Sequence, residues 1–382
     1  MRRAIIVGGG IGGLTAGLAL SQRGWDVSVH EAAPELRPVG AGIWVPINAL
    51  RVLDRLGVAA AVTAAGVELD RIQLLTSGGD EIYSTDLRPL RHRLGHTVVS
   101  IRRAKLVEQL AAALPPRSLR LGSALVDYNV SSDRVLAVFA DGGEAAGDLL
   151  VAADGIHSLV RQKLDSAAGL RTSGQVCYRG ISRLKLPDEC RRSAREYWGG
   201  ASRFGWSVVG PEEVYWYAPV SLANQGRDSS RDLVEKLRAR YTDFPDPIPE
   251  LLRRTAASDV IHTELNEIWR SRRWWSERVV LLGDAAHAMT PNLGQGGAQA
   301  IEDAYVLADV LAEHSELNAG LATYQRRRQA RVAWIAATAR RIGQLAHWEQ
   351  PLLCRIRNGI LRNMPSSWHS RPLWRLLAQG PV

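Results

Sequence analysis

Six glycines between positions 8 and 17 constrain the fold of this chain more than any other feature of its sequence. Gly8, Gly10 and Gly13 match the pattern GxGxxG directly after a short apolar run, Ala4–Val7, which is typical of a buried parallel strand. At such a place the first glycine permits a tight turn, the second lets the backbone approach a pyrophosphate, and the third lets helix and strand pack closely. The segment therefore predicts a Rossmann-like unit that binds a dinucleotide.

The residues that follow the glycines complete this unit. We expect a helix over Leu14–Arg23, whose N-terminal N–H groups and positive dipole end would face the phosphates. Val27 and Val29 alternate along a second strand that ends at Glu31. A carboxylate at this position can bind ribose hydroxyls.

Two further apolar strands end in a carboxylate. Asp148–Ala153 runs into Asp154–Gly155, and Val279–Leu282 runs into Gly283–Asp284. In an open α/β fold, ligands bind outside the carboxyl ends of the strands. The second strand is followed by Pro291–Gly297, a stretch whose glycines would let the backbone approach a flat ring.

Together these motifs resemble those of the FAD-dependent aromatic hydroxylases, also called class A flavoprotein monooxygenases. The resemblance rests on GxGxxG with Glu31, on ADG at 153–155, and on GD at 283–284 with PNLGQGG behind it. It implies an α/β fold in which a Rossmann-like FAD-binding domain with a parallel sheet is interleaved with an antiparallel-sheet substrate domain, followed by C-terminal helices. We assign residues 1–70, 95–170 and 275–310 to the FAD-binding domain, 71–94 and 171–274 to the substrate domain, and 311–382 to the helical region.

The resemblance also implies which residues bind FAD. In that family the aspartate of GD contacts the ribityl chain, and an arginine near the phosphates corresponds to Arg103, with Arg102 an equally basic candidate. The segment Pro38–Leu50 resembles the stretch that runs past the adenosine end towards the isoalloxazine. The expected FAD-binding residues are Gly8, Gly10, Gly12, Gly13, Glu31, Gly42, Arg103, Asp154, Gly155, Asp284, Gly294, Gly296 and Gly297.

The implied reaction is insertion of one oxygen atom from O₂ into an electron-rich aromatic or heteroaromatic substrate. NADH or NADPH would reduce FAD, and the oxygen would be transferred from a flavin C4a-hydroperoxide. The sequence holds no second GxGxxG unit, as expected where NAD(P)H binds without a Rossmann domain of its own. Two alternatives stay open: a flavin epoxidase or hydroxylase of a prenylated or polyketide metabolite, and an FAD dehydrogenase without oxygen transfer.

The sequence pattern in the middle of the chain predicts where the substrate binds. From Gln175 to Val220 short aromatic-rich segments alternate in polarity, which indicates an antiparallel sheet with one wet face. Such a sheet laid over a flavin would form a largely apolar pocket with a few polar groups. The catalytic candidates are Arg203, Tyr215, Tyr217, Pro291 and Asn292, and the substrate-binding candidates are Trp44, Tyr178 and Trp216. Some family members have an aspartate at the position of Asn292, so we expect a substrate that ionises by itself or needs only hydrogen bonding.

The charge and the cysteine content limit the classes of ligand and partner that we expect. Lysine and arginine number 48 against 39 acidic residues, a formal net charge of +9 that is almost entirely arginine. The arginines occur in small scattered groups rather than in one stripe, so we expect a small-molecule substrate and no nucleic acid. Three widely spaced cysteines argue against a disulfide framework and against a CxxC metal site, and they agree with a reducing cytoplasm.

The C-terminal region from Ile342 to Leu377 has a helical pattern of apolar residues with arginines between them. One interpretation is a helix packed on the core, and the other is an amphipathic surface that touches a membrane or closes over an apolar substrate. This tail, with HAMTPNLGQG, resembles the branch of the family that forms 2-alkyl-3-hydroxy-4-quinolones. A quinolone with an apolar chain is therefore one expected substrate.

Overall fold

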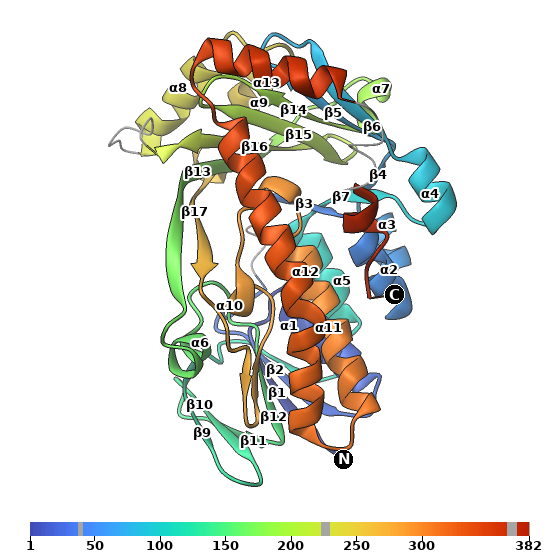
Figure 1. Cartoon of the computed structure of the whole chain (residues 1–382), viewed down its shortest axis with the longest axis vertical. Coiled ribbons are helices and arrows are strands. Elements are labelled where there is room, and N and C mark those ends of the chain that lie inside the picture. Colours follow the sequence, from blue (N-terminus) through green and yellow to red (C-terminus); the bar gives the residue numbers. More distant parts are fainter. Residues whose placement is uncertain (37–40, 223–229, 365–372, 382) are drawn as a thin grey trace.

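The N-terminal glycine motif follows β1, a central strand of a parallel sheet (Figure 1). The computed structural model describes residues 1–36, 41–222, 230–364 and 373–381. The six-stranded sheet has the order β18-β19-β12-β1-β2-β8, and all neighbours are parallel except the edge strand β18. Its strands are β1 (Arg3–Val7), β2 (Asp26–His30), β8 (Leu119–Arg120), β12 (Leu149–Ala152), β18 (Trp275–Ser276) and β19 (Val279–Leu281). The expected Rossmann-like α/β architecture is confirmed.

The turn after β1 depends on two glycines. Gly8 has a φ of +105°, which side chains rarely allow, and a Cβ on Gly13 would lie 1.9 Å from the carbonyl oxygen of Gly8. The helix that starts there, α1 (Ile11–Ser21), is buried along most of its length because it packs against α5 (Arg103–Ala112) and α11 (Gly296–Glu313). The glycine pattern thus fixes how closely α1 approaches the sheet.

A second, seven-stranded sheet has the order β17-β13-β16-β15-β14-β5-β6. It is antiparallel except where β14 pairs with β5. Its strands are β5 (Arg71–Thr76), β6 (Glu81–Asp86), β13 (Gly169–Arg183), β14 (Ser193–Trp198), β15 (Arg203–Gly210), β16 (Glu213–Ser221) and β17 (Ile261–Trp269). The antiparallel sheet expected from the aromatic segments is therefore present.

The prediction that this sheet has one wet face is wrong. On β15 every residue from 203 to 209 is buried, so both faces are covered. One face carries Phe204, Trp206 and Trp216, which form an apolar cluster with residues of α8 (Ser230–Arg240) and α9 (Ile248–Arg254). The other face lies against a small sheet of β3 (Gly42–Val45), β4 (Val67–Leu69) and β7 (Val98–Arg102). Alternation therefore separates two buried environments here, rather than core from solvent.

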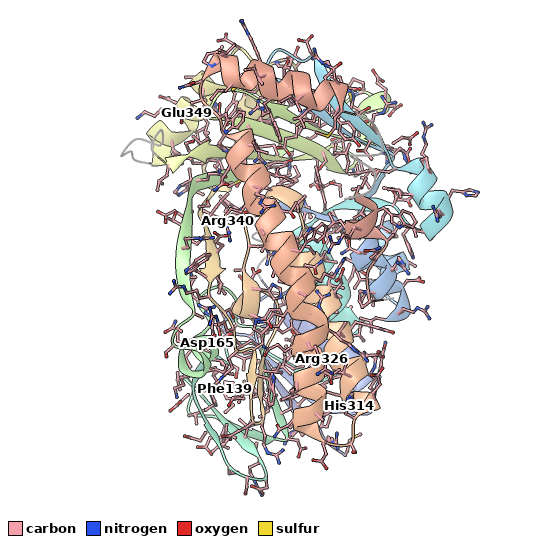
Figure 2. All side chains as sticks on the ribbon, viewed as in Figure 1. Phe139, Asp165, His314, Arg326, Arg340 and Glu349 are labelled. Carbon is pink, nitrogen blue, oxygen red and sulfur yellow. The ribbon has the colours of Figure 1, made fainter. Side chains whose placement is uncertain are left out.

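One long helix reaches both sheets. The helix α12 (Leu317–Ala346) runs beside α11 and then towards the antiparallel sheet (Figure 1). Arg340 on α12 lies beside the β13–β17 ribbon (Figure 2), where its Nε is 2.8 Å from Oε1 of Glu267. The remaining elements are α2 (Ile47–Arg55), α3 (Ala59–Ala64), α4 (Arg88–Leu94), β9 (Leu125–Val130), β10 (Val135–Phe139), β11 (Glu144–Gly147), α6 (Leu159–Leu164), α7 (Asp188–Arg191), η2 (Ala257–Asp259), α10 (Asp284–His287), η3 (Pro291–Leu293) and α13 (Pro351–Asn363).

Within the described ranges, none of the helices combines the length and the apolar character required to cross a membrane.

Candidate functional site

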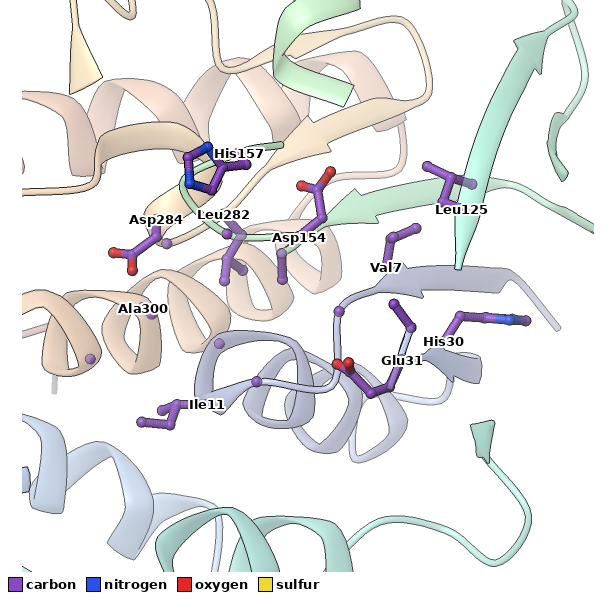
Figure 3. A pocket seen from close by; sticks show the side chains of 18 of the residues that line it. Val7, Ile11, His30, Glu31, Leu125, Asp154, His157, Leu282, Asp284 and Ala300 are labelled. Carbon is purple, nitrogen blue, oxygen red and sulfur yellow. The ribbon is translucent and has the colours of Figure 1, made fainter. Parts of the chain in front are cut away.

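A cavity of about 430 Å³ opens at the carboxyl ends of the parallel strands (Figure 3). The glycine turn after β1, the end of β2 and the turns after β12 and β19 all contribute to its lining. Ten of the thirteen predicted FAD-binding residues line it: Gly8, Gly10, Gly12, Glu31, Arg103, Asp154, Gly155, Asp284, Gly296 and Gly297. The structure thus brings together residues that are up to 289 positions apart in the sequence.

Three predicted residues, Gly13, Gly42 and Gly294, are not among those lining the cavity. Gly13 packs on Gly8, and a Cβ on Gly42 would lie 2.4 Å from the ring of Tyr215. Gly294 has a φ of +61° and ends η3. These glycines shape the walls around the cavity. Residues 38–40 of the predicted Pro38–Leu50 segment lie outside the described residues.

The polar groups of the cavity suit a phosphate- and hydroxyl-rich ligand. A Cβ on Gly10 would meet nothing within 4 Å, so the backbone there is open to a pyrophosphate. Glu31 is held beside this turn because its carboxylate accepts hydrogen bonds from the N–H groups of Gly9 (2.6 Å) and Ala33 (2.9 Å). The residues present therefore fit FAD at its phosphate and ribose end.

Two carboxylates mark the next part of the cavity (Figure 3). Asp284 is exposed at the start of α10, directly after β19. Oδ1 of Asp154 is buried and has no hydrogen-bond partner, and burial raises the pKa of this carboxyl group. A buried polar atom without a partner requires one, and the hydroxyls of a ribityl chain would supply it.

A buried group of charges holds the GD turn in place, and the sequence analysis missed most of it. Asp303 of α11 accepts from the Gly283 N–H (3.1 Å), from His287 Nε2 (2.5 Å) and from Arg328 Nε (2.6 Å). Burial alone would raise the pKa of Asp303, but His287 and Arg328 lower it to about 2. We call His287, Glu302, Asp303, Arg328 and Arg331 the Asp303 cluster.

The acid pair in α11 and the arginines in α12 were its only sequence signal. Glu302 pairs with both Arg328 (2.6 Å) and Arg331 (2.9 Å), and its side chain is fully buried. Charged residues at buried positions of apolar helices are rare unless they are paired. The position of His287 in this cluster gives it a structural partner.

A second group of polar side chains gathers where the antiparallel sheet meets β3 and η3. Nη1 of Arg203 donates to Oδ1 of Asn292 at 2.7 Å, and the rings of Trp44 and Tyr217 lie 6.1 Å apart at an angle of 79°. Tyr215 packs beside Tyr217 with a ring separation of 5.7 Å. Of the predicted substrate-side residues, the structure brings these five together. Pro291 begins η3 and is exposed next to them.

Tyr178 and Trp216 are misplaced by the sequence prediction. Successive residues of a strand point to opposite faces, so Trp216 faces away from Tyr215 and Tyr217. Trp216 donates to Oγ1 of Thr255 at 2.9 Å, and Tyr178 belongs to the same apolar cluster under α9. Both side chains therefore belong to the core on the helix-covered face, not to a substrate wall.

Glu196 of β14 was not predicted, yet it connects the second group. Its Oε1 lies 2.7 Å from Trp198 Nε1 and 2.8 Å from Arg203 Nε, and its Oε2 accepts from the Tyr217 hydroxyl at 2.7 Å. A lone acid among aromatic residues on a strand was the available signal. We call Glu196, Trp198, Arg203, Tyr217 and Asn292 the Glu196 cluster.

Comparison with known proteins agrees with this geometry. A parallel sheet with a glycine turn and two carboxylate-ended strands defines a dinucleotide-binding protein. The chain belongs to the FAD binding domain family, whose model matches residues 2–339. The expected family of FAD-dependent monooxygenases is confirmed.

Several relatives are similar over nearly their whole length. An aurachin C monooxygenase/isomerase of Stigmatella aurantiaca is 39% identical, covering 95% of this chain and 94% of its own. A 2-heptyl-3-hydroxy-4(1H)-quinolone synthase of Pseudomonas aeruginosa is 33% identical, covering 97% of each. The crystal structure of Klebsiella pneumoniae HpxO complexed with FAD and uric acid has a TM-score of 0.91 at 28% identity, and covers all of this chain and 97% of HpxO.

Proposed function

We propose that this protein uses NADH or NADPH, FAD and O₂ to insert one oxygen atom into an electron-rich heteroaromatic ring, with 4-quinolones that carry an apolar chain as the first candidates. The observation that carries the proposal is the position of β3 between the cavity and the antiparallel sheet that carries most of the Glu196 cluster. Ile43 lines the cavity while its neighbour Trp44 bonds Ser207 of the antiparallel sheet. A substrate against Trp44 and Asn292 would thus lie next to a ring held at Gly296 and Gly297.

Bound FAD, reduced by NAD(P)H, would supply the activation of O₂. The protein would hold this group through the glycine turn, Arg103, Asp154 and Asp284. The N-terminus of α11 begins at Gly296 on the cavity, so its dipole favours negative charge on a ring placed there. Arg203, Tyr217 and Asn292 would orient the substrate, and the buried sheet would keep water out.

The test is substrate-stimulated oxygen transfer by the purified FAD-loaded protein. NADH and NADPH oxidation is measured with 2-heptyl-4(1H)-quinolone, urate, simple phenols and prenylated aromatics, and the products are analysed by mass spectrometry under ¹⁸O₂. The proposal expects one labelled oxygen in the product of a heteroaromatic probe. NAD(P)H oxidation coupled to substrate oxidation without label would instead show a dehydrogenase.

We also propose that the protein is cytoplasmic and that α13 makes weak contact with an anionic membrane. Leu352, Leu353, Ile356 and Ile360 are 38% to 67% exposed on this helix. The sequence of α13 contains three arginines and no acidic residue. Its inner side is anchored, because buried Arg357 donates to the carbonyls of Leu345 and Ala346. An apolar face beside cationic groups is the pattern of an interfacial helix.

Flotation with liposomes tests this contact. Wild type should float with vesicles that contain phosphatidylserine more than with pure phosphatidylcholine, and the double variant Leu352→Ser, Ile356→Ser should remain at the bottom in both. Equal flotation of the variant and wild type would refute the contact. The variant's FAD absorbance checks that it is folded.

A further inference from the structure

The hydroxyl of Tyr217 has a single proton, and the structure shows where it points. It donates to Oε2 of Glu196 at 2.7 Å. An ionised carboxylate can only accept hydrogen bonds, so this contact sets the direction of the O–H. On its other side, Tyr217 can present only oxygen lone pairs.

Glu196 is itself fixed in one orientation. Its Oε1 accepts from the indole N–H of Trp198 (2.7 Å) and pairs with Arg203 (2.8 Å). The Arg203 side chain is 3% exposed and also donates to Asn292. Because the Trp198 N–H and the charged Arg203 side chain both lie at Oε1, Oε2 stays directed at Tyr217.

Trp44, the aromatic neighbour of Tyr217, also uses its only hydrogen-bond donor, the indole N–H, within the protein. Its Nε1 donates to Oγ of Ser207 at 2.9 Å, and that hydroxyl is 2.8 Å from Oγ of Ser100. Trp44 and Tyr217 are partly exposed, whereas Ser100 and Ser207 are buried. The N–H of Trp44 and the O–H of Tyr217 are thus both used inside the protein, so neither is left to donate to a ligand.

We infer that Glu196 determines substrate specificity: by taking the only proton of Tyr217, it makes Tyr217 an acceptor that selects aromatic substrates carrying a ring N–H or a phenolic O–H. The inference rests on the proposed function, because it assigns the aromatic substrate to this wall. A hydrogen bond from the substrate N–H to Tyr217 leaves more electron density on the ring, which favours attack by an electrophilic oxygen. An analogue with this donor methylated leaves the oxygen of Tyr217 without a partner and should bind about 10- to 100-fold more weakly.

Replacing Glu196 by glutamine should reverse the direction of the hydrogen bond between residue 196 and the Tyr217 hydroxyl. Because the Trp198 N–H donates at the position of Oε1 and the Arg203 guanidinium lies beside it, the amide oxygen is favoured there. The amide NH₂ would then lie at the position of Oε2 and donate to the oxygen of Tyr217. The Tyr217 O–H is released to point at the substrate, where it opposes an N–H.

The experiment measures dissociation constants of 2-heptyl-4(1H)-quinolone and its N-methyl analogue by calorimetry on the FAD-loaded protein. Wild type should prefer the N–H probe about 10- to 100-fold. In Glu196→Gln this preference should fall at least tenfold, and Tyr217→Phe, which lacks the acceptor, should also lose it. Glu264→Gln, an exposed acid on β17, is the matched control and should keep the wild-type ratio.

A wild-type ratio near one, an unchanged ratio in both variants, or no binding of either probe would overturn the inference. Tyr217→Phe keeps the test decisive if Glu196→Gln does not fold. The binding measurement does not depend on turnover, so it tests the specificity role independently of the oxygen-transfer reaction. Discrimination without a labelled product would overturn the proposed function alone, and labelled product without discrimination would overturn the specificity role alone.

Discussion

The Asp303 cluster and the Glu196 cluster are both groups of side chains built around a carboxylate and an arginine, but they differ in access. In the Asp303 cluster, the side chains of its five residues are 0% to 15% exposed, and two acids meet two arginines. In the Glu196 cluster, Glu196 is 19% exposed, and Nδ2 of Asn292 is buried without a hydrogen-bond partner. The closed cluster supports the cavity, while the Glu196 cluster is partly open at its carboxylate.

The largest effect is expected from Asp303→Ala. This change leaves Arg328 and His287 buried next to a missing partner, which costs about 3–5 kcal/mol in the free energy of unfolding. Urea denaturation measures it. The control is Asp309→Ala on the same helix, whose pair with Arg23 is 40% exposed on the aspartate side and should contribute less than about 1 kcal/mol. Equal costs for both variants would contradict the supporting role of the cluster.

Asp284→Ala should separate ligand binding from stability. Asp284 is exposed on the turn that Asp303 holds, so its loss should leave the unfolding midpoint unchanged. Without a charged partner for the ribityl hydroxyls, the dissociation constant of FAD should rise about 10- to 100-fold. Fluorescence titration of the apoprotein with FAD measures this change. Full FAD occupancy after purification would refute the assignment of Asp284.

Acid should affect the surroundings of the Glu196 cluster and the Asp303 cluster in different pH ranges, because His347 lies within reach of the charges of Arg203 and Glu196. Burial, and next the charge of Arg203, lower the pKa of His347 from 6.5 to about 4, so the folded state resists its protonation. The neutral form of His347 contributes fully to the free energy of unfolding above pH 6.5, and this contribution is lost as the pH falls towards 4. The contribution of ionised Asp303 to the free energy of unfolding is lost only from about pH 4 to 2.

His347→Gln should therefore reduce the destabilisation between pH 7 and pH 5 by about 1–2 kcal/mol. Urea denaturation at both pH values measures it. His30, whose pKa is also lowered to about 4, mainly by burial, contributes to the same range, so His30→Gln serves as the comparison. An identical pH profile in wild type and His347→Gln would contradict this assignment.

The smallest effect on substrate binding is expected from Trp216→Phe, which belongs to neither cluster. Its stability should fall by about 2–3 kcal/mol, because the fully buried indole leaves a cavity and Thr255 loses its donor. The KM for the substrate found in the turnover assay should change less than twofold. Trp44→Phe, which also loses an indole hydrogen bond, should raise that KM several-fold. A larger KM change for Trp216→Phe would contradict the assignment of Trp216 to the core and would indicate that it contacts the substrate.

The FAD side of the molecule could be predicted from the sequence because its determinants are local. Gly8, Gly10 and Glu31 occupy one strand–turn–helix–strand unit, and each glycine has a backbone reason to be there. The same holds for Asp154 and Asp284, which directly follow apolar strands. Ten residues of the expected set line one cavity as a result.

The substrate side could be predicted only in part because its determinants are not local. Alternation shows that Tyr215 and Trp216 face opposite ways, but it does not show which face meets β3 and which is covered by α9. Glu196 reaches Tyr217 across β15, and this contact depends on strand order, which the sequence does not display. Arg328 likewise finds Asp303 only through the packing of two long helices.

The helix α12 carries two residues of the Asp303 cluster, Arg328 and Arg331, and packs against the Glu196 cluster. Arg328 binds Asp303, and 15 residues later Gly343 packs so tightly on Asn292 that a Cβ would lie 2.3 Å from its Nδ2. At 1.5 Å per residue, these points are about 22 Å apart along a single rod. A single rigid helix therefore carries the arginine that pairs with Asp303 and, about four turns further on, the glycine that leaves room for the Asn292 amide.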